Sequence, residues 1–363
     1  MKIDVCLTGD VMTGRGVDQI LPSASNPTLH EEYVKDARDY VSLAEGVNGR
    51  IDVPVKWDYV WGDALPLMQK ADARVINLET SVTTSDDRWP DKGIHYRMHP
   101  GNLECLRSAG IDCCVLANNH VLDWGFAGLA ETLETLGEAG IRSAGAGLDR
   151  EGARAPAVLP FPDGRRLLVF AWGSGFSGIP ETWRAGADRP GINLLEDLSG
   201  ETIGRISSLV SMHRRPGDLV VISLHWGPNW GYQVPEGRVR FAHGLIDSGC
   251  ADLVHGHSTH HPIGIERYRG KLILYGCGDF LNDYEGISGH DSFRPDLALL
   301  YRVTIPERSE AEWELRMTPL QIRRMRLNHA STTDAQWLAA TLTRASASFE
   351  TRISFAEGNE LVA

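Results

Sequence analysis

Four histidines lie within one short segment, at His255, His257, His260 and His261, directly after the strand-like run 252–254. Imidazole nitrogen is the commonest protein ligand for zinc-, iron- and manganese-class ions, and a turn that leaves a strand can bring alternate side chains to one point. The spacing matches no four-ligand zinc-finger pattern, so a histidine-rich surface turn is the alternative interpretation. The segment indicates part of a metal site and does not complete one.

Four other strand-like runs end in polar side chains of the ligand type. Each run is rich in Val, Ile and Leu, as in strands buried on both faces, and ligands of such sheets gather at the carboxyl ends of the strands. The run 3–10 ends in Asp10, and the run 73–79 ends in Glu79. The run 113–120 ends in Asn118, Asn119 and His120, and the run 219–225 ends in His225. We expect these side chains to meet at one end of a sheet.

Carboxylates, imidazoles and an amide oxygen are the groups that hold two divalent metals around a bridging carboxylate. Such a pair lowers the pKa of a bound water and stabilises the transition state of hydrolysis. Arg15, soon after Asp10, is able to hold a phosphate or carboxylate by a bidentate pair, and a surface ion pair is the alternative.

The segment 118–123 combines an amide, an imidazole and a carboxylate. An Asn oxygen is able to ligate a metal while His120 projects toward the substrate and Asp123 orients the imidazole. A histidine with a carboxylate partner suits a general acid or a charge stabiliser near neutral pH. An Asn-rich turn that caps the following helix is the other interpretation.

The composition is that of a globular protein and does not exclude a phosphorylated small molecule bound at a local cation. The 363 residues carry 36 Lys and Arg against 48 Asp and Glu, and this net charge of −12 argues against a general nucleic-acid binder. The chain enters its first strand-like run at once and has no apolar run near the about 20 residues that span a bilayer. We therefore expect a cytoplasmic protein without a membrane segment, whose six scattered cysteines are structural thiols.

Strand-like and helix-like segments alternate up to about residue 290, which predicts an α/β or α+β fold. Helical spacing is found over 124–139 and about 201–213. Residues 22–70 form an excursion between the first two core strands, placed to supply substrate contacts and closed by a helix-like stretch at 61–70. After residue 296 we expect strands over 297–305 and 313–317 and a final helix over 333–351.

Five ordered strings give these patterns a family resemblance: LTGDVMTGR, INLETSVT, ANNHVLDWG, SLHWG and HGHSTHH. Together they resemble the CapA family of poly-γ-glutamate capsule synthesis proteins, within the calcineurin-like metallophosphoesterase superfamily, over about residues 1–290. The resemblance implies a four-layer sandwich of two mixed β-sheets flanked by helices, with the metal site at one end. It also suggests a metallophosphoesterase-like domain over 1–296, with 297–363 packing on that core.

The resemblance further implies a centre of one or two divalent ions such as manganese, zinc or iron. By position, its ligands would be Asp10 and His260 for the first metal, Glu79 for the bridge, and Asn119, His225 and His257 for the second metal. His261 is the substitute for His260, and His120 corresponds to the histidine beside the attacked centre.

Two positions differ from the usual pattern of the superfamily. Met12 stands where a histidine is usual, and a thioether is a poor ligand for hard divalent ions. Glu79 replaces a bridging aspartate. A mononuclear site is therefore an alternative to a dinuclear one.

Two further clusters lie outside the five strings. Lys92 and Arg97 fall within 92–100, where cations suit an anionic substrate and a solvated loop is the alternative. In 275–286, Asp279 either supports a ligating histidine, or Asp283 replaces the ligand missing at Met12, or the segment is a structural turn.

The leading hypothesis is a metal-dependent hydrolase that uses a metal-bound hydroxide on a small anionic or glutamyl-containing substrate, either a phosphoester or a γ-glutamyl or peptide amide. His120 would assist the leaving group or the charged intermediate. The rival is a non-catalytic accessory or binding protein of a poly-γ-glutamate or peptide ligase system, which Met12 favours. A third hypothesis, an amide-bond-forming enzyme, finds no glycine-rich phosphate loop in the sequence.

Overall fold

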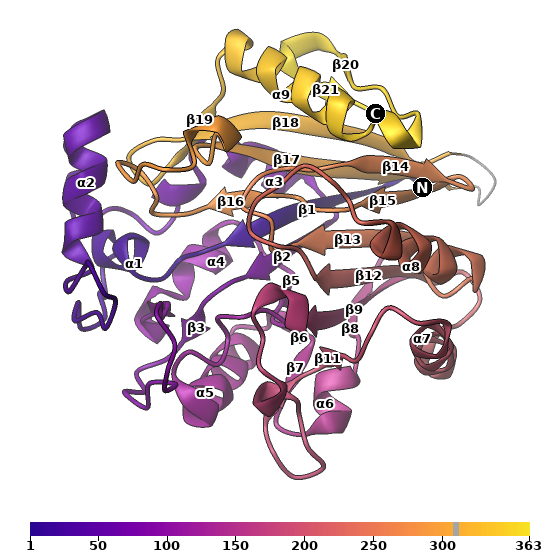
Figure 1. The fold of residues 1–363 in the computed structure, drawn as a ribbon, viewed down its shortest axis with the longest axis horizontal. Helices are drawn as coiled ribbons and strands as arrows, with labels where there is room; N and C mark the ends of the chain where they lie inside the picture. Colours follow the sequence, from indigo (N-terminus) through magenta and orange to yellow (C-terminus); the bar gives the residue numbers. More distant parts are fainter. Residues whose placement is uncertain (308–311) are drawn as a thin grey trace.

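The computed structural model describes residues 1–307 and 312–363. Within these residues, two mixed β-sheets stack face to face, with helices over their outer faces (Figure 1). Ten strands form the larger sheet: β1 (Ile3–Val11), β2 (Ala73–Leu78), β5 (Cys113–Val115), β6 (Arg142–Ala144), β16 (Asp279–Leu281), β17 (Leu297–Ile305), β18 (Glu314–Ile322), β19 (Leu327–His329), β20 (Ser354–Phe355) and β21 (Leu361–Val362). Its main path runs β20-β21-β18-β17-β1-β2-β5-β6.

The second sheet follows the order β11-β9-β12-β13-β15-β14, with β8 beside β9. Its strands are β8 (Ala157–Pro160), β9 (Arg166–Ser174), β11 (Leu194–Leu195), β12 (Leu219–His225), β13 (Leu253–His257), β14 (Ile265–Tyr268) and β15 (Lys271–Leu274). Two short pairs complete the described strands: β3 (Ser81–Val82) with β4 (Arg97–Met98), and β7 (Ala146–Gly147) with β10 (Gly191–Ile192).

The helices fall into groups that cover different faces. Their bounds are α1 (Gly16–Ile20), α2 (Arg38–Asn48), α3 (Leu65–Lys70), α4 (Glu104–Ser108), α5 (Gly125–Glu138), α6 (Arg150–Arg154), α7 (Gly200–His213), α8 (Glu236–Asp247) and α9 (Thr332–Ala345). In Figure 1, α9 lies above β18, and α7 and α8 lie on the side of the second sheet.

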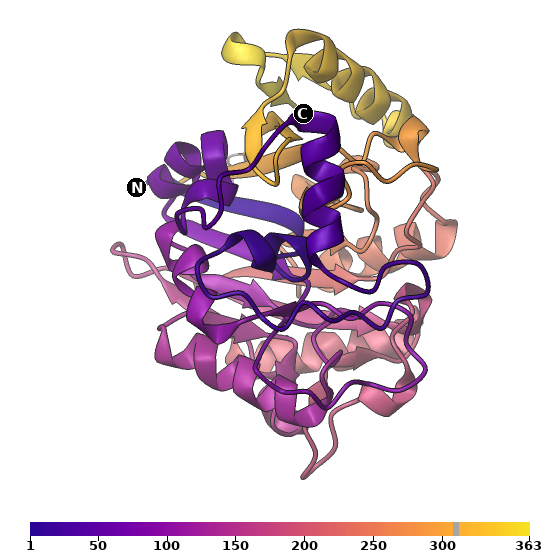
Figure 2. The same ribbon diagram turned by 90° about the vertical axis from the view of Figure 1, so that its left-hand side faces the viewer.

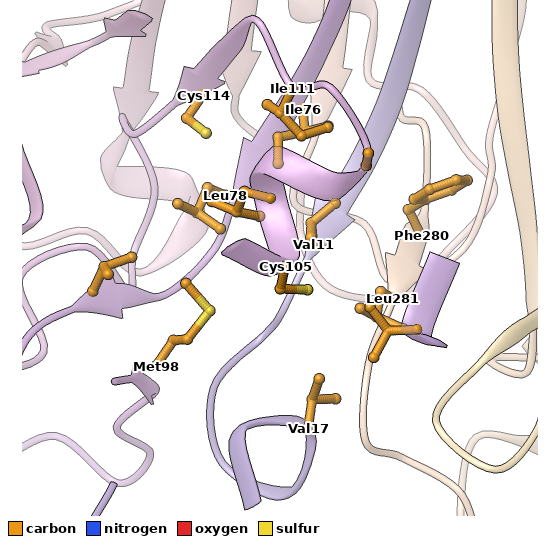
Figure 3. Close-up of a cluster of buried hydrophobic side chains, with 14 of the residues drawn as sticks. Val11, Val17, Ile76, Leu78, Met98, Cys105, Ile111, Cys114, Phe280 and Leu281 are labelled. Atoms are coloured by element: carbon orange, nitrogen blue, oxygen red, sulfur yellow. The ribbon is translucent and has the colours of Figure 1, made fainter. Parts of the chain in front are cut away.

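Apolar side chains of the strands divide between three buried clusters, which define four layers. Val75 and Val221 face the core between the two sheets. Ile76 and Leu78 face the opposite way, into a cluster that also contains side chains of α1 to α5. Figure 3 shows them near Cys105 of α4. On the far side, β9, β12 and β13 pack against α7 and α8. The predicted sandwich of two mixed sheets flanked by helices is confirmed.

A β-bulge in β1 changes the face to which its last residues point. Val5 and Leu7 belong to the core between the sheets, whereas Val11, which alternation would place with them, belongs to the outer cluster. The pairing of β1 with β2 shifts between Leu7 and Asp10. A bulge adds one residue to a strand and so reverses the alternation beyond it. Asp10 is thereby turned toward the second sheet, where His257 lies.

The strands that carry the polar residues end at the same side of the molecule. β1, β2 and β5 are parallel, as are β9, β12 and β13. Figure 1 shows these carboxyl ends toward the side that carries α1 and α2, and Figure 2 turns that side toward the viewer. The excursion 22–70, drawn in indigo and purple, lies across it. It contains α2, a helix that the sequence patterns did not indicate.

The elements that the sequence analysis expected agree with the structure except at their ends. The helix expected at 124–139 is α5, and the one at 201–213 is α7, whose Ser199 side chain caps the Thr202 N–H. The final helix was predicted too long: α9 ends at Ala345, and a short 3-10 turn over Ala347–Phe349 follows, after which Glu350 has a left-handed backbone conformation. The tail strand expected at 313–317 is longer, and β17 and β18 continue the larger sheet beside β1.

Candidate metal centre

Three buried carboxylates meet where β1 and β2 end and β16 begins. Asp10, Glu79 and Asp279 each have an exposed fraction of 1% or less. Asn77 donates hydrogen bonds to Asp10 (2.7 Å) and Glu79 (3.0 Å), so one amide holds both side chains in place. Burial and the neighbouring Asp279 raise the pKa of Asp10 to about 7, and burial with the Asp10 charge raises the pKa of Glu79.

Close backbone approach positions Asp10. A Cβ atom on Gly9 would lie 1.7 Å from the Gly278 carbonyl oxygen, so only glycine allows β1 to run this close to the turn before β16. The Asp10 N–H donates to the same carbonyl (2.9 Å). From the second sheet, the Ser258 N–H points at the Asp10 carboxylate (3.2 and 3.4 Å).

Two histidines of the second sheet face Asp10. His225 ends β12 and His257 ends β13, and the two residues are direct partners in the parallel register. Their Nδ1 atoms lie 2.8 Å apart, and His257 Nδ1 lies 3.9 Å from Asp10 Oδ1. The ligand atoms of Asp10, His225 and His257 all lie within 4.8 Å of one another. Burial lowers the pKa of both histidines well below the ordinary value, so both imidazoles are neutral.

A chain of hydrogen bonds assigns the tautomer of His257. His255 Nε2 lies 2.8 Å from the Thr8 carbonyl, which only accepts, so the His255 proton is on Nε2 and its Nδ1 is an acceptor. The Ser223 hydroxyl lies 3.0 Å from that Nδ1 and therefore donates to it. Ser223 Oγ then accepts from His257 Nε2 (2.9 Å). His257 Nδ1 is left with its lone pair directed at the site.

His225 presents a second lone pair. Its Nε2 lies 3.0 Å from Asn119 Oδ1, so the Nε2 proton is donated to that oxygen. His225 Nδ1 then faces His257 Nδ1 at 2.8 Å without a proton between them. Two lone pairs at this distance repel unless a cation holds both.

A second ligand group shares Asp10. His260 Nδ1 lies 2.9 Å from Asp279 Oδ1, and the ligand atoms of Asp10, His260 and Asp279 again lie within 4.8 Å of one another. Asn282 donates to the other Asp279 oxygen (2.8 Å). Although burial opposes it, the Asp279 carboxylate raises the pKa of His260.

The donor set fits divalent metal ions. Carboxylate and imidazole are the ligands that manganese, iron and zinc take in proteins. In residues 1–307 and 312–363, no Lys or Arg forms a salt bridge with Asp10, Glu79 or Asp279. Burial and mutual repulsion raise the pKa of Asp10 and Glu79, so their ionised forms are costly here, and a divalent ion would stabilise these forms and would also relieve the repulsion of the facing imidazole lone pairs.

His120 lies beside this centre and contacts the carboxylate of Asp123, which in turn pairs with the ammonium group of Lys92. Its Nδ1 lies 2.7 Å from Asp123 Oδ2, and Lys92 Nζ lies 2.7 Å from Asp123 Oδ1. Burial, together with Lys92, lowers the pKa of His120 to about 4 against the opposing effect of Asp123. His120 is therefore a neutral imidazole that Asp123 orients, and its ring packs edge-on against Tyr96 with centroids 4.5 Å apart.

The predicted substrate cations lie in different surroundings. Arg15 is buried and forms a bidentate pair with Asp283 (3.0 and 2.5 Å) together with a bond to Glu31 (2.9 Å). Asp283 is thus a partner of Arg15 in this structure. Arg97 contacts Asp86 (2.8 Å) and stacks over Trp124.

The remaining predicted positions also have defined neighbours. Met12 is buried, and the Tyr284 hydroxyl lies 3.5 Å from its sulfur. His261 accepts the Gly231 N–H (3.1 Å) and stacks on Trp230, whereas His260 belongs to the second ligand group.

The sequence analysis considered Asp279 as a support for a ligating histidine and did not name it as a ligand candidate. In the structure it both contacts His260 and joins a ligand group. A signal was present: Asp279 follows the strand-like run 271–274 as Asp10 follows its own run. Because a turn separates the run 271–274 from Asp279, the similarity to Asp10 is not apparent from the sequence pattern.

The family model described as "Bacterial capsule synthesis protein PGA_cap" matches residues 4–284, which include every ligand candidate above. The chain belongs to this family. The resemblance to CapA proteins is thereby confirmed.

Two relatives of this PGA_cap protein differ in their sequence identity to it and in the share of the chain that they match. A probable polyglutamine synthesis accessory protein of Mycobacterium tuberculosis is 48% identical over 354 residues, covering 97% of this chain and 93% of that protein. The capsule biosynthesis protein CapA of Bacillus anthracis is 26% identical over 234 residues, covering 62% of this chain and 54% of that protein.

Among solved structures, GAP50, the anchor in the inner membrane complex of Plasmodium, covers 95% of this chain and 96% of its own, at 8% identity and a TM-score of 0.33. A likeness at this level carries no argument about function. In the described part of the chain, none of the helices has the length and apolar character needed to cross a membrane.

Proposed function

We propose that this PGA_cap protein is a metal-dependent hydrolase of an anionic substrate, with a role in poly-glutamate synthesis. One observation carries the proposal: two ligand groups, Asp10–His225–His257 and Asp10–His260–Asp279, share a carboxylate beside an oriented imidazole. The names of the relatives, capsule biosynthesis and polyglutamine synthesis, support the biological setting. Phosphoesters and γ-glutamyl or peptide amides both suit the chemistry.

The two ligand groups would hold the ions, together with Glu79 and Asn119, which lie next to these groups. When bound, such ions supply Lewis acidity and activate water. The chain itself supplies orientation and proton transfer. Ser223 fixes the His257 ring, and Asn119 fixes the His225 ring. Asp123 fixes the His120 ring with Nδ1 directed at the Asp123 carboxylate. His120 Nε2 is then free to accept a proton at the reacting centre, where Asp123 stabilises the resulting charge.

Metal analysis and turnover test the proposal together. Purified protein is analysed for metal content, then supplied with manganese or zinc and assayed with bis(p-nitrophenyl) phosphate and γ-glutamyl-p-nitroanilide. We expect bound metal and turnover, with both lost in His225→Ala and His257→Ala. If no metal binds, and the biological activity survives both substitutions, the hydrolase proposal fails.

A second variant tests the place of His120. His120→Asn keeps the size of the side chain and removes the base, so turnover should fall by about 10²–10⁴-fold with the metal content near normal. Loss of metal in this variant would contradict the role that we assign to His120.

A non-catalytic accessory role is the second candidate. It is favoured by the name of the mycobacterial relative and by Met12, which lies against Tyr284 at a position where the superfamily usually has a histidine. Bound metal without turnover of either substrate, in a protein whose metal ligands are still needed for polymer synthesis, would favour this candidate.

A further inference from the structure

A cavity of about 720 Å³ opens beside the candidate metal centre. Its lining includes His260, which belongs to a ligand group, and Asn119 and His120, which lie beside the ligand groups. Ligand sites are of this size and are mostly apolar with few polar groups. The part of a substrate that lies beyond the reacting group would occupy this cavity.

The cations of the cavity are already neutralised. Of the described residues that line it, only Arg15 and Lys92 are Arg or Lys. Arg15 is held by Asp283 and Glu31, and Lys92 is held by Asp123. Glu32, also in the lining, is exposed and has no such partner among the described residues. Beyond the metal centre the wall therefore offers no spare positive charge to a polyanionic chain.

Large apolar side chains stand open to solvent around the same cavity. Four of them are exposed: Tyr33 (89%), Ile94 (42%), Ile287 (42%) and Leu43 (39%). Exposed apolar side chains that gather around a cavity indicate a binding surface, whereas single ones need no explanation.

Contacts of the buried Arg15 fix the wall of the cavity that carries these exposed apolar side chains, which we call the rim. Tyr40 of α2 lies under the Arg15 guanidinium, whose carbon is 3.8 Å from the ring centroid, and Arg15 Nη1 bonds the Tyr40 hydroxyl (3.0 Å). Arg15 also binds Glu31 and Asp283, so one buried cation joins the excursion to the turn after β16. The cavity thus exists before a ligand binds.

From the charge balance and the rim we propose that this cavity accepts an apolar or aromatic group attached to the single anionic group held at the metal centre. The substrate class is a monoester or amide with an uncharged apolar substituent, and a poly-γ-glutamate chain does not occupy the cavity. This inference rests on the proposed function and specifies its substrate.

Three phosphonates that differ in their substituent test this inference. Their binding to the manganese-loaded protein is measured by titration calorimetry. They are methylphosphonate, benzylphosphonate and 3-phosphonopropanoate, which share the metal-binding group. Burial of roughly 60 Å² of apolar surface corresponds to about tenfold in affinity. We expect benzylphosphonate to bind about tenfold more tightly than methylphosphonate, and 3-phosphonopropanoate to bind no more tightly than methylphosphonate.

Variants locate the effect. Tyr33→Ser and Ile94→Ser should each reduce the advantage of benzylphosphonate by about threefold or more and leave methylphosphonate binding unchanged. Met212→Ser is the matched control, because Met212 is 74% exposed on α7, outside this lining. If the advantage persists in both rim variants, the apolar group binds elsewhere and the inference fails.

The outcomes separate the two proposals. Equal binding of the three phosphonates, or tightest binding of 3-phosphonopropanoate, overturns the inference and leaves the metal centre standing. Failure of every phosphonate to bind, with no metal in the protein, overturns both.

Discussion

The ligand cluster and the cavity rim lie at the same end of the molecule and are built in opposite ways. In the cluster, buried polar side chains from both sheets are fixed by hydrogen bonds such as Asn77 to Asp10 and Ser223 to His257. The rim consists of exposed apolar side chains on loops and on α2, such as Tyr33 and Leu43. Under the proposed function, the fixed cluster would perform the chemistry and the rim would select what reaches it.

The largest effect is expected from Asp10, because it belongs to both ligand groups. Asp10→Asn should remove bound metal and lower turnover by about 10⁴-fold, since Lewis-acid stabilisation contributes several kcal/mol and each 1.36 kcal/mol is tenfold. Elemental analysis and steady-state kinetics measure both. Asp4→Asn is the control on the same strand, where the side chain bonds Thr304 instead. Full metal content in Asp10→Asn would show that the centre is assembled differently.

Arg15 connects the two regions, and its loss should destabilise the protein. Arg15→Gln leaves the buried carboxylates of Asp283 and Glu31 without their cation, which typically costs about 3–5 kcal/mol. Arg240→Gln is the comparison, because Arg240 and its partner Glu236 are 67% and 84% exposed and such pairs contribute about 1 kcal/mol or less. Denaturant unfolding measures both. A stable Arg15→Gln protein that loses only phosphonate affinity would instead make Arg15 a substrate ligand.

Ser223 sharpens the account of the cluster, since it touches no proposed ligand atom. Ser223→Ala removes the acceptor that fixes His257 Nε2–H, and loss of such outer partners typically lowers metal affinity by about 10–100-fold. Competition titration with a chelator measures the affinity. Ser223→Thr keeps a hydroxyl and should recover most of it; equal weakening in both variants would point to packing as the cause.

The smallest effect is expected at the rim. Leu43→Ser changes a side chain that is 39% exposed, so the free energy of unfolding should stay within about 0.5 kcal/mol of the parent. Thermal unfolding of the metal-loaded protein measures this. A larger loss would mean that the rim packs against another part of the protein and is not open for a ligand.

Sequence patterns located the elements of the centre because each ligand follows a strand. The runs that end at Asp10 and His225 are long and apolar, so their period and their last residue are readable without a structure. The same logic did not single out Asp279 as a ligand candidate, because a turn separates the run from the carboxylate, and it missed α2, where only Tyr40 and Ala44 are buried. Short amphipathic signals in an excursion are weak, because most of such a helix faces solvent.

By itself, the sequence determined the layered α/β class, the strand ends that carry the ligand types and the family, since these depend on local periodicity and ordered strings. The tertiary structure alone decided how those ends combine. The bulge that turns Asp10 toward His257, the tautomer chain through Ser223, and the pairing of Arg15 with Asp283 all join residues far apart in the chain. Such contacts depend on register and on distance in space, which no local pattern encodes.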